Sequence, residues 1–317
     1  MDLANVGYNK RTMATQTNMF SKLTQNTLEY VKQYNSYGEL VTTSIPNLAV
    51  FSRDDKTVFE AILYQPAFCL ILQGQKETVI GERTIRYSEG DALVVSHDLP
   101  VVSRVIKASK THPYLALVFH LDLGQLRSMQ DEIATSDTTE ADATSVFVCK
   151  ADELLVDALH RYFSLVDKPV EAKVLAPLIE KEILFRLLMA PYGAMLRNML
   201  KRDSNASRIN HAIGIIRQQY RSTLVVPDVA QAVGMSTSSF HEHFKTVTQN
   251  TPLQYQKDLR LMEAKRLLME GKHSVSSTAF EVGYESPSQF SRDYSRKFGV
   301  SPQADANNEK QSQFIPP

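Results

Sequence analysis

The sequence has little of several features that mark other classes of protein. It contains no tryptophan and two cysteines, Cys69 and Cys149, which form no CxxC pair and have no histidine nearby. Isolated cysteines of this kind predict no zinc site and are typical of a reducing compartment. No apolar run reaches the roughly 20 residues of a membrane helix, and residues 1–20 lack the apolar core of a secretory signal. We therefore expect a cytoplasmic protein that does not enter the membrane.

A net charge is also absent, because 35 Lys and Arg residues balance 35 Asp and Glu residues. This balance conceals a mild asymmetry between the two parts of the chain. Residues 1–203 carry 22 basic and 25 acidic side chains, whereas residues 204–306 carry 12 and 9. The small positive excess permits DNA binding by the C-terminal part, but it is too small to predict DNA binding by itself.

Catalytic and metal-binding patterns are missing as well. His97, His112 and His120 are scattered along the chain, so they lack the clustered spacing of a metal site. Cys69 lies in an apolar run, without the basic neighbour that activates a nucleophilic thiol. Neither a glycine-rich phosphate loop nor a Ser/His/Asp order is evident. The sequence therefore predicts no catalytic residue, no metal and no cofactor, and hence a protein that is not an enzyme.

What the sequence does contain is a duplicated motif near its C-terminus. Residues 233–252 read VGMSTSSFHEHFKTVTQNTP, and residues 282–302 read VGYESPSQFSRDYSRKFGVSP. Each copy predicts a short helix, a turn at Gly234 or Gly283, a serine cap and a second helix, which is the pattern of a helix-turn-helix. Two such units in one chain could read two segments of one DNA groove.

The second helix of each unit has one apolar face and one polar face. At about 100° per residue, Phe240 and Phe244 in the first copy, and Phe290 and Tyr294 in the second, point to the core. The opposite faces supply the predicted DNA contacts, which are Ser238, His241, Glu242, Lys245, Ser288, Ser291, Arg292 and Arg296.

Arg292 is the best single candidate for a bidentate contact to guanine. The alternative is that its guanidinium pairs with a phosphate, or with Asp293 or Glu285. The two interpretations differ in their consequence, because only a base contact discriminates between DNA sequences.

A long helix is predicted between the units, with Thr251 as its cap, Pro252 as its first residue and Gly271 at its end. A helix of this length spans about 28 Å, against roughly 34 Å for one turn of B-DNA. It could therefore hold the two reading helices about one turn apart on one face of the duplex. Its basic side chains either contact phosphates or form a solvated face; they are Lys257, Lys265 and Arg266.

The chain as a whole predicts an α+β protein. Short apolar runs with Gly and Pro breaks between Ile45 and Leu123 are typical of a small antiparallel barrel or sandwich. Helical spacing follows over residues 150–202, and the polar segment 131–145 is expected to be an exposed loop. The predicted division is a flexible arm at 1–22, an N-terminal domain at 23–202, a double helix-turn-helix domain at 203–304 and a disordered tail at 305–317.

Several segments resemble the AraC/XylS-type transcription regulators. The segments MSTSSFHEHFK, TPLQYQKDLRLMEAKRLL and VGYESPSQFSRDYSRKFGVSP carry the C-terminal resemblance, over about 100 residues. Upstream, YQPAFCLILQGQKETVIGE, YSEGDALVVSHDLPVV, HPYLALVFHLDL and LAPLIEKEILFRLLMAPYG resemble the AraC-type N-terminal regulatory domain. The resemblance implies a cupin-like antiparallel β-barrel followed by a helical hairpin. It also places the family's base-reading positions on Ser238, His241, Glu242, Ser288 and Arg292.

Two positions depart from the family pattern. Glu242 stands where this branch often has arginine; a carboxylate is repelled by phosphates, yet it can accept from the amino group of cytosine. Gln249-Asn250 replaces a glycine that is usual at the turn before Thr251. Because asparagine tolerates left-handed backbone, we expect this turn to persist.

Three functions are compatible with these observations. The first is a sequence-specific DNA-binding transcription regulator with a sensing barrel, which by family habit would be an activator. The second is a regulator whose barrel mediates only dimerisation or protein contact, without a ligand. The third, which the residues favour least, is a barrel enzyme fused to a helix-turn-helix module. The expected partners are double-stranded DNA, RNA polymerase, a possible small-molecule effector and a possible homodimer, and no effector-binding residue is assigned.

Overall fold

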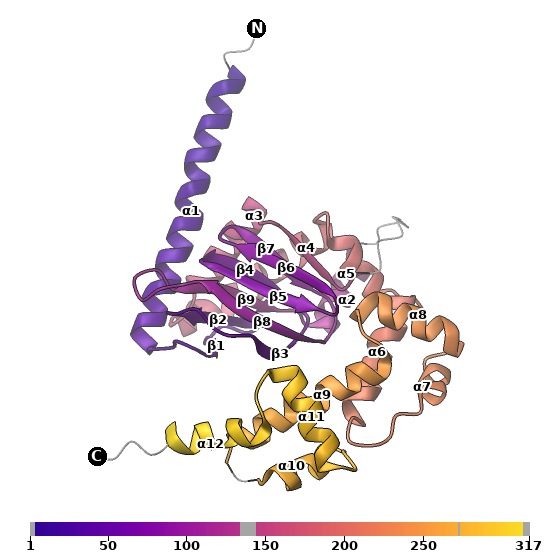
Figure 1. Ribbon diagram of the computed structural model, residues 1–317. Helices are drawn as coiled ribbons and strands as arrows, with labels where there is room; N and C mark the ends of the chain where they lie inside the picture. Colours follow the sequence, from indigo (N-terminus) through magenta and orange to yellow (C-terminus); the bar gives the residue numbers. More distant parts are fainter. Residues whose placement is uncertain (1–3, 134–143, 272, 313–317) are drawn as a thin grey trace.

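The chain folds into an N-terminal domain of sheets and helices, followed by an all-helical C-terminal domain (Figure 1). The computed structural model describes residues 4–133, 144–271 and 273–312, with side chains described between residues 19 and 307 of these ranges. The predicted α+β class is confirmed. Of the expected loop at 131–145, residues 134–143 lie outside the described ranges.

The N-terminal domain contains two sheets whose described strand pairs are all antiparallel. The order of the larger sheet is β1 (Leu40–Thr42), β2 (Leu48–Arg53), β9 (Tyr114–His120), β4 (Ala67–Gln73), β7 (Asp91–Val95) and β10 (Val146–Lys150). The order of the smaller sheet is β3 (Glu60–Tyr64), β8 (Leu99–Lys107), β5 (Gln75–Ile80) and β6 (Arg83–Ser88).

The larger sheet is buried on both faces. Side chains alternate along β4, so that Phe68 and Leu70 belong to the core beneath the helices, whereas Cys69 and Ile71 face the core shared with the smaller sheet. This double burial explains why β4 reads as an almost continuous apolar run rather than as a strict alternation.

Helices cover the outer face of the larger sheet. They are α1 (Ala4–Tyr34), α2 (Leu123–Ile133), α3 (Glu153–Phe163), α4 (Pro169–Met189) and α5 (Gly193–Leu200). The predicted hairpin is formed by α3 and α4, and the Asp152 side chain caps α3 by accepting from the amide of Leu155. Within the described ranges, no helix has the length and apolar content that crossing a membrane requires.

Both chain ends differ from the sequence expectation. The arm expected at 1–22 is helical from Ala4 in α1, whose contacts with the domain are made by Leu23 and Val31 among others. The tail expected from residue 305 begins within helix α12 (Pro302–Ser312), because Ala306 is buried and Asp305 accepts a 2.7 Å hydrogen bond from Tyr294. Residues 1–3 and 313–317 lie outside the described ranges.

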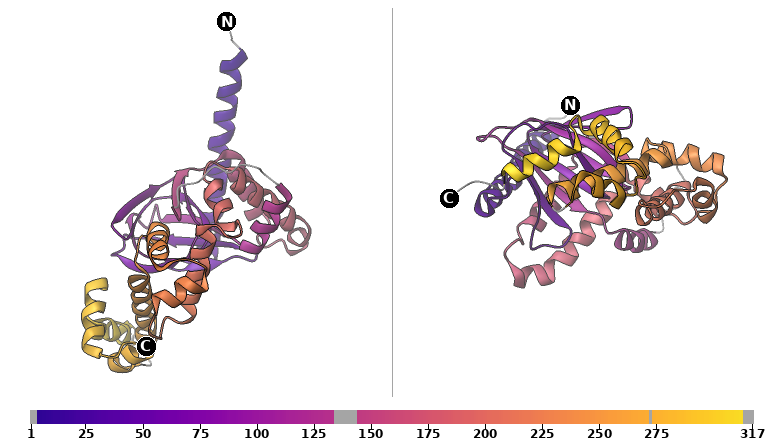
Figure 2. Two further views of the ribbon diagram at one scale, coloured as in Figure 1. Left: turned by 90° about the vertical axis from the view of Figure 1, so that its right-hand side faces the viewer. Right: turned by 60° about the horizontal axis from the view of Figure 1, so that its bottom comes forward.

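Helix α6 (Asn205–Gln218) comes next, and the Ser204 side chain caps it. Two helix-turn-helix units follow, separated by a long helix. Their elements are α7 (Val226–Ala232), α8 (Thr237–Thr248), α9 (Pro252–Met269), α10 (Val275–Glu281) and α11 (Pro287–Phe298). Figure 1 and the left view of Figure 2 show the C-terminal domain and α1 at opposite ends of the sheets.

The two domains are joined by polar contacts as well as by the chain. The Asp98 carbonyl accepts a 2.8 Å hydrogen bond from the Tyr255 hydroxyl, and the Asp98 carboxylate pairs with Arg217. Next to it, the buried His97 places Nε2 3.1 Å from the carbonyl oxygen of Ala206. Residues 97 and 98 therefore fasten the start of β8 to α6 and α9.

His97 should make the stability of the folded chain depend on pH. Burial lowers its pKa from 6.5 to about 4, against the opposing effect of its bond to Ala206. As pH falls below 6.5, this histidine becomes protonated in the unfolded chain but stays neutral in the folded chain. The stability present at neutral pH is therefore lost between about pH 6.5 and 4. When the pH falls from 7 to 4.5, the free energy of unfolding of the wild type should decrease by about 2–3 kcal/mol more than that of His97→Gln. Urea titrations at both pH values would measure it.

The matched control is His112→Gln, because His112 is exposed in a loop. This variant should retain the wild-type dependence on pH. A His97→Gln protein with an unchanged dependence would show that His97 is not the group responsible.

Candidate nucleic-acid interface

The first helix-turn-helix unit is built as its sequence predicts. Gly234 adopts a left-handed φ of +68° between α7 and α8, where a residue with a Cβ would be strained. The Ser236 side chain then caps α8 by accepting from the amide of Ser239. Phe240 and Phe244 are fully buried, with ring centroids 5.4 Å apart. These contacts fix which face of α8 is turned outward.

The second unit repeats this construction. Gly283 forms the turn at φ +89°, and a Cβ there would lie 2.1 Å from the carbonyl oxygen of Arg221. Ser286 caps α11, and Phe290 and Tyr294 are buried with ring centroids 5.5 Å apart. The aromatic pairs thus occupy equivalent places in both units, as predicted.

The structure turns seven of the eight predicted DNA contacts toward solvent. The exposed ones are Ser238, His241, Glu242, Lys245, Ser288, Arg292 and Arg296. Ser291 is half-buried, and its hydroxyl donates a 2.9 Å hydrogen bond to the carbonyl of Pro287. This hydroxyl is therefore left able to accept a hydrogen bond but not to donate one.

Arg292 does not form the intramolecular pairs that were its alternative. Across the side chains that the structure describes, no hydrogen bond or ion pair involves its guanidinium. The neighbouring Asp293 is buried and is engaged by Lys257 at 3.2 Å and by Arg296 at 3.6 Å. The exposed guanidinium thus keeps all its donors for another molecule.

Helix α9 connects the units and belongs to both of their cores. Its Leu259 lies in the core of the first unit, whereas Leu261 lies in the core of the second. Thr251 caps the helix, as predicted, and Gly271 follows its end with a φ of +69°. The units are consequently held by one rigid element rather than by a flexible linker.

Arg260 on α9 joins the turn of the second unit to the segment between α6 and α7. Its Nε donates to the Tyr220 carbonyl at 2.6 Å, its Nη1 to the Gly283 carbonyl at 2.8 Å and its Nη2 to the Ser222 carbonyl at 2.8 Å. This role was not predicted, because nothing local in the sequence reveals that a helical arginine will meet distant carbonyls.

The basic side chains of α9 are paired within the domain. Lys257 contacts Asp293, and Lys265 lies 3.8 Å from Asp305. Arg266 pairs with Glu263 and Glu270 on its own helix. These residues were expected either to contact phosphates or to form a solvated face. Phosphate contact would require each of them to break an ion pair with a carboxylate.

The turn before Thr251 persists, but through a different residue than expected. Gln249 adopts the left-handed conformation, with φ +60°, in place of Asn250. Its carbonyl packs against Gly81 at the tip of the β5–β6 hairpin, where a Cβ would lie 2.6 Å from that oxygen. Gln249 thus combines the contact with Gly81 and the left-handed conformation, which the sequence had led us to expect at Asn250.

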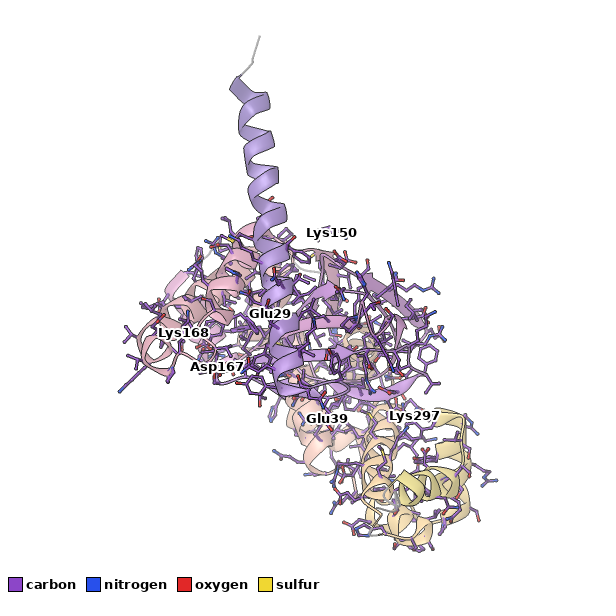
Figure 3. All side chains as sticks on the ribbon, turned by 90° about the vertical axis from the view of Figure 1, so that its left-hand side faces the viewer. Glu29, Glu39, Lys150, Asp167, Lys168 and Lys297 are labelled. Atoms are coloured by element: carbon purple, nitrogen blue, oxygen red, sulfur yellow. The ribbon has the colours of Figure 1, made fainter. Side chains whose placement is uncertain are left out.

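A cleft of about 550 Å³ lies beside this contact, between the hairpin and the C-terminal domain. Lys245 and Arg296, two predicted DNA contacts, line it together with Glu82 of the hairpin. Lys297, labelled in Figure 3, also lines the cleft and pairs with Asp258 at 2.8 Å. Access of DNA to the C-terminal ends of α8 and α11 therefore depends on how the two domains are arranged.

Neither cysteine has the environment of a reactive thiol. Burial raises the pKa of Cys69 to about 11, against a smaller opposing effect of Lys76. Burial, with a contribution from Asp91, also raises the pKa of Cys149. A raised pKa suppresses the thiolate that nucleophilic or transfer chemistry needs.

Replacing Arg260 should destabilise the C-terminal domain. Arg260→Met leaves the carbonyls of Tyr220, Ser222 and Gly283 without this donor, which should lower the free energy of unfolding by about 2–4 kcal/mol. Arg292→Met is the matched control, and because Arg292 is exposed its effect should stay within about 0.5 kcal/mol. Chemical denaturation followed by circular dichroism would measure both, and equal effects would contradict the role of Arg260.

Comparison with known proteins agrees with this architecture. Residues 44–195 match the family model of the AraC-type transcriptional regulator N-terminus, and residues 229–308 match that of a helix-turn-helix domain. The virulence regulon transcriptional activator VirF of Yersinia enterocolitica is 23% identical over 245 residues, covering 75% of this chain and 88% of VirF. The HTH-type transcriptional activator RhaS of Escherichia fergusonii is 27% identical over 155 residues, covering 48% of this chain and 55% of RhaS.

The fold as a whole also resembles a solved structure. The apo form of a ToxT variant from Vibrio cholerae aligns with a TM-score of 0.54 at 10% identity, over 84% of this chain and 99% of the ToxT chain. At that identity the likeness concerns the fold alone. With both family models matched in order along one chain, the protein belongs to the AraC-type transcriptional regulators, in which an N-terminal regulatory domain precedes a DNA-binding helix-turn-helix domain.

Proposed function

We propose that this regulator inserts α8 and α11 into neighbouring major grooves on one side of a DNA duplex. The observation that carries the proposal is that α9 contributes to the cores of both units. Its 18 residues span about 27 Å at roughly 1.5 Å per residue, which approaches the roughly 34 Å repeat of B-DNA. A connector of this length suits two reading helices on one face of the duplex.

The outward residues divide into two roles in this proposal. Arg292 reads guanine through two parallel hydrogen bonds, and Glu242 accepts from a cytosine amino group. Lys245 and Arg296 contact phosphates, which supply affinity without sequence choice. The remaining predicted contacts, to which no individual DNA group is assigned, are Ser238, His241, Ser288 and Ser291.

Activation of transcription, through contact with RNA polymerase, is the regulatory outcome that we propose. VirF and RhaS, which match this chain in sequence, are both named as transcriptional activators. The chain would act in the cytoplasm, where DNA and polymerase are found, and its two free cysteines suit that reducing environment. No thiol-based catalysis is proposed, because both thiols have raised pKa values.

Two roles of the N-terminal domain remain in competition, which are sensing a small molecule and mediating protein contact alone. A cavity filled by side chains, or one without polar groups, would favour contact alone. The N-terminal domain instead holds a cavity of about 320 Å³ that a lysine side chain enters. This favours sensing, and the cavity is large enough for a small ligand.

The base-reading role of Arg292 can be tested with the purified protein. Genomic footprinting would first give an operator, and binding would then be measured at one fixed salt concentration. Arg292→Ala should weaken operator binding by about 1–3 kcal/mol and relax the preference at one base pair. Arg266→Ala is the control, because Arg266 is also exposed but already paired with Glu263 and Glu270, so it should leave the preference unchanged. An equal loss on every DNA sequence would contradict base reading by Arg292.

Helix α4 suits the homodimer that we also propose. A stripe of exposed apolar side chains follows its surface at helical spacing, consisting of Val170, Val174, Leu178, Phe185 and Met189. Leu178, which the helical pattern alone would place in the core, is 65% exposed. A second copy of the helix would cover such a stripe, as in a coiled coil.

Sedimentation velocity would test the dimer. Leu178→Glu should shift the protein from dimer to monomer, because it places a charge in the apolar contact. Leu154→Glu is the control, since Leu154 is also exposed but lies on α3, and it should remain dimeric. A monomeric wild type at about 50 μM, well above a micromolar dissociation constant, would contradict the proposal.

A further inference from the structure

The cavity of the N-terminal domain lies between its two sheets. Strands β1 and β2 of the larger sheet line one side, and β3 of the smaller sheet lines the other. Its wall is mostly apolar and aromatic, and includes Tyr64, Leu93, Val95 and Tyr114. The volume of about 320 Å³ falls at the lower end of the roughly 300–1,000 Å³ that is usual for small-molecule sites.

Lys76 is the unusual residue of this cavity. It lines the wall from β5 and is 8% exposed. Its Nζ lies 4.8 Å from the ring centroid of Phe51 and 5.6 Å from that of Tyr64. Throughout the described side chains, no carboxylate lies within 4.0 Å of this Nζ and no hydrogen bond satisfies it.

Such an arrangement leaves the amino group of Lys76 available to a ligand in the cavity. Lysine is seldom buried without a partner, because removing its ammonium group from water costs free energy. The faces of two aromatic rings offset part of that cost but do not neutralise the charge. The folded domain therefore presents the amino group of Lys76 to a largely apolar cavity, with no carboxylate within 4.0 Å of it among the described side chains.

The nearest acidic residue in sequence cannot supply that anion. Side chains alternate along β5, so Glu77 points to the opposite face of the strand from Lys76. There Glu77 is engaged by Arg86 at 2.5 Å and by Arg104 at 2.8 Å, and these bonds lower its pKa. Glu60, which also lines the cavity, pairs with Arg53 at 3.2 Å.

We propose that this cavity binds a small organic monocarboxylate with an apolar body, whose carboxylate pairs with Lys76. The inference rests on the regulatory function proposed above and names the class of effector that the N-terminal domain senses. The single amino group of Lys76 can pair with one carboxylate of a ligand. The rings of Phe51, Tyr64 and Tyr114 can pack against an apolar or flat ligand body. The volume has room for about ten non-hydrogen atoms, at roughly 30 Å³ for each water-sized group.

The position of β3 connects this cavity to the DNA-binding domain. Among the described strands, β3 is at the edge of the smaller sheet and pairs with β8. Leu63 on β3 lines the cavity and also packs against the core of the first helix-turn-helix unit. A ligand that displaces β3 thus changes the surface on which the C-terminal domain is docked.

Binding is tested by calorimetry on the full-length protein without DNA. The probes are two acids, hexanoate and 3-phenylpropanoate, each compared with its neutral amide of the same shape. At least one acid should bind at least tenfold more tightly than its amide. The proposal would be overturned if each acid and its amide bound with equal affinity. It would also be overturned if the dissociation constants of both acids exceeded about 10 mM.

Variants assign the effect to Lys76. Lys76→Met removes the charge but keeps the length of an unbranched side chain, and it should lower acid affinity at least tenfold while leaving amide affinity unchanged. Lys76→Arg should restore the preference for the acid. Lys110→Met, at an exposed lysine in a loop away from the cavity, should behave as the wild type. Circular dichroism would verify that each variant is folded, and an unaffected acid preference in Lys76→Met would refute the assignment.

DNA affinity is measured separately, so that the two proposals can fail independently. The acid that binds should change the dissociation constant for operator DNA at least threefold in the wild type and not in Lys76→Met. An intact DNA complex with no acid binding would overturn only the effector. Acid binding without any change in DNA affinity would overturn the connection through β3, and failure of DNA binding under all conditions would overturn the proposed function itself.

Discussion

The structure of the DNA-binding half depends on one helix that two hydrophobic cores share. Because neighbouring residues on α9 enter different cores, neither unit can rotate about the helix without exposing apolar surface. Arg260 adds hydrogen bonds to the segment between α6 and α7 and to the turn of the second unit. The spacing of the two polar faces is thereby a property of the folded domain, which a partner chain does not need to impose.

The N-terminal domain contributes through its contacts with α6 and α9. Asp98 and His97 sit at the start of β8, and β8 pairs with β3, the edge strand beside the cavity. The same few elements therefore border the cavity, the domain contact and the first helix-turn-helix unit. Since the cleft beside them includes predicted DNA contacts, a change in docking would alter the surface available to DNA.

Local patterns predicted much of this architecture. Helical spacing and turn chemistry act over a few residues, so they are readable from the sequence. They predicted the aromatic pairs of the two units, the caps at Ser236 and Thr251 and the positions of the glycine turns. The buried position of Lys76 at the cavity could not be predicted, because strand alternation tells which residues share a face but not which face is inside. The contacts of Asp98 and Arg260 were also not predicted, because their partners are distant in sequence and approach them only in the folded chain.

The tip of the β5–β6 hairpin limits how closely the two halves of the protein can approach. Gly81 meets the Gln249 carbonyl with no room for even one methyl group, and its own φ of +57° already disfavours other residues. Any larger side chain there would work as a spacer, setting a wider separation while leaving the cavity and the outward faces of α8 and α11 chemically intact. The absence of a side chain at this position thus allows the hairpin of the N-terminal domain to lie directly against the C-terminal domain.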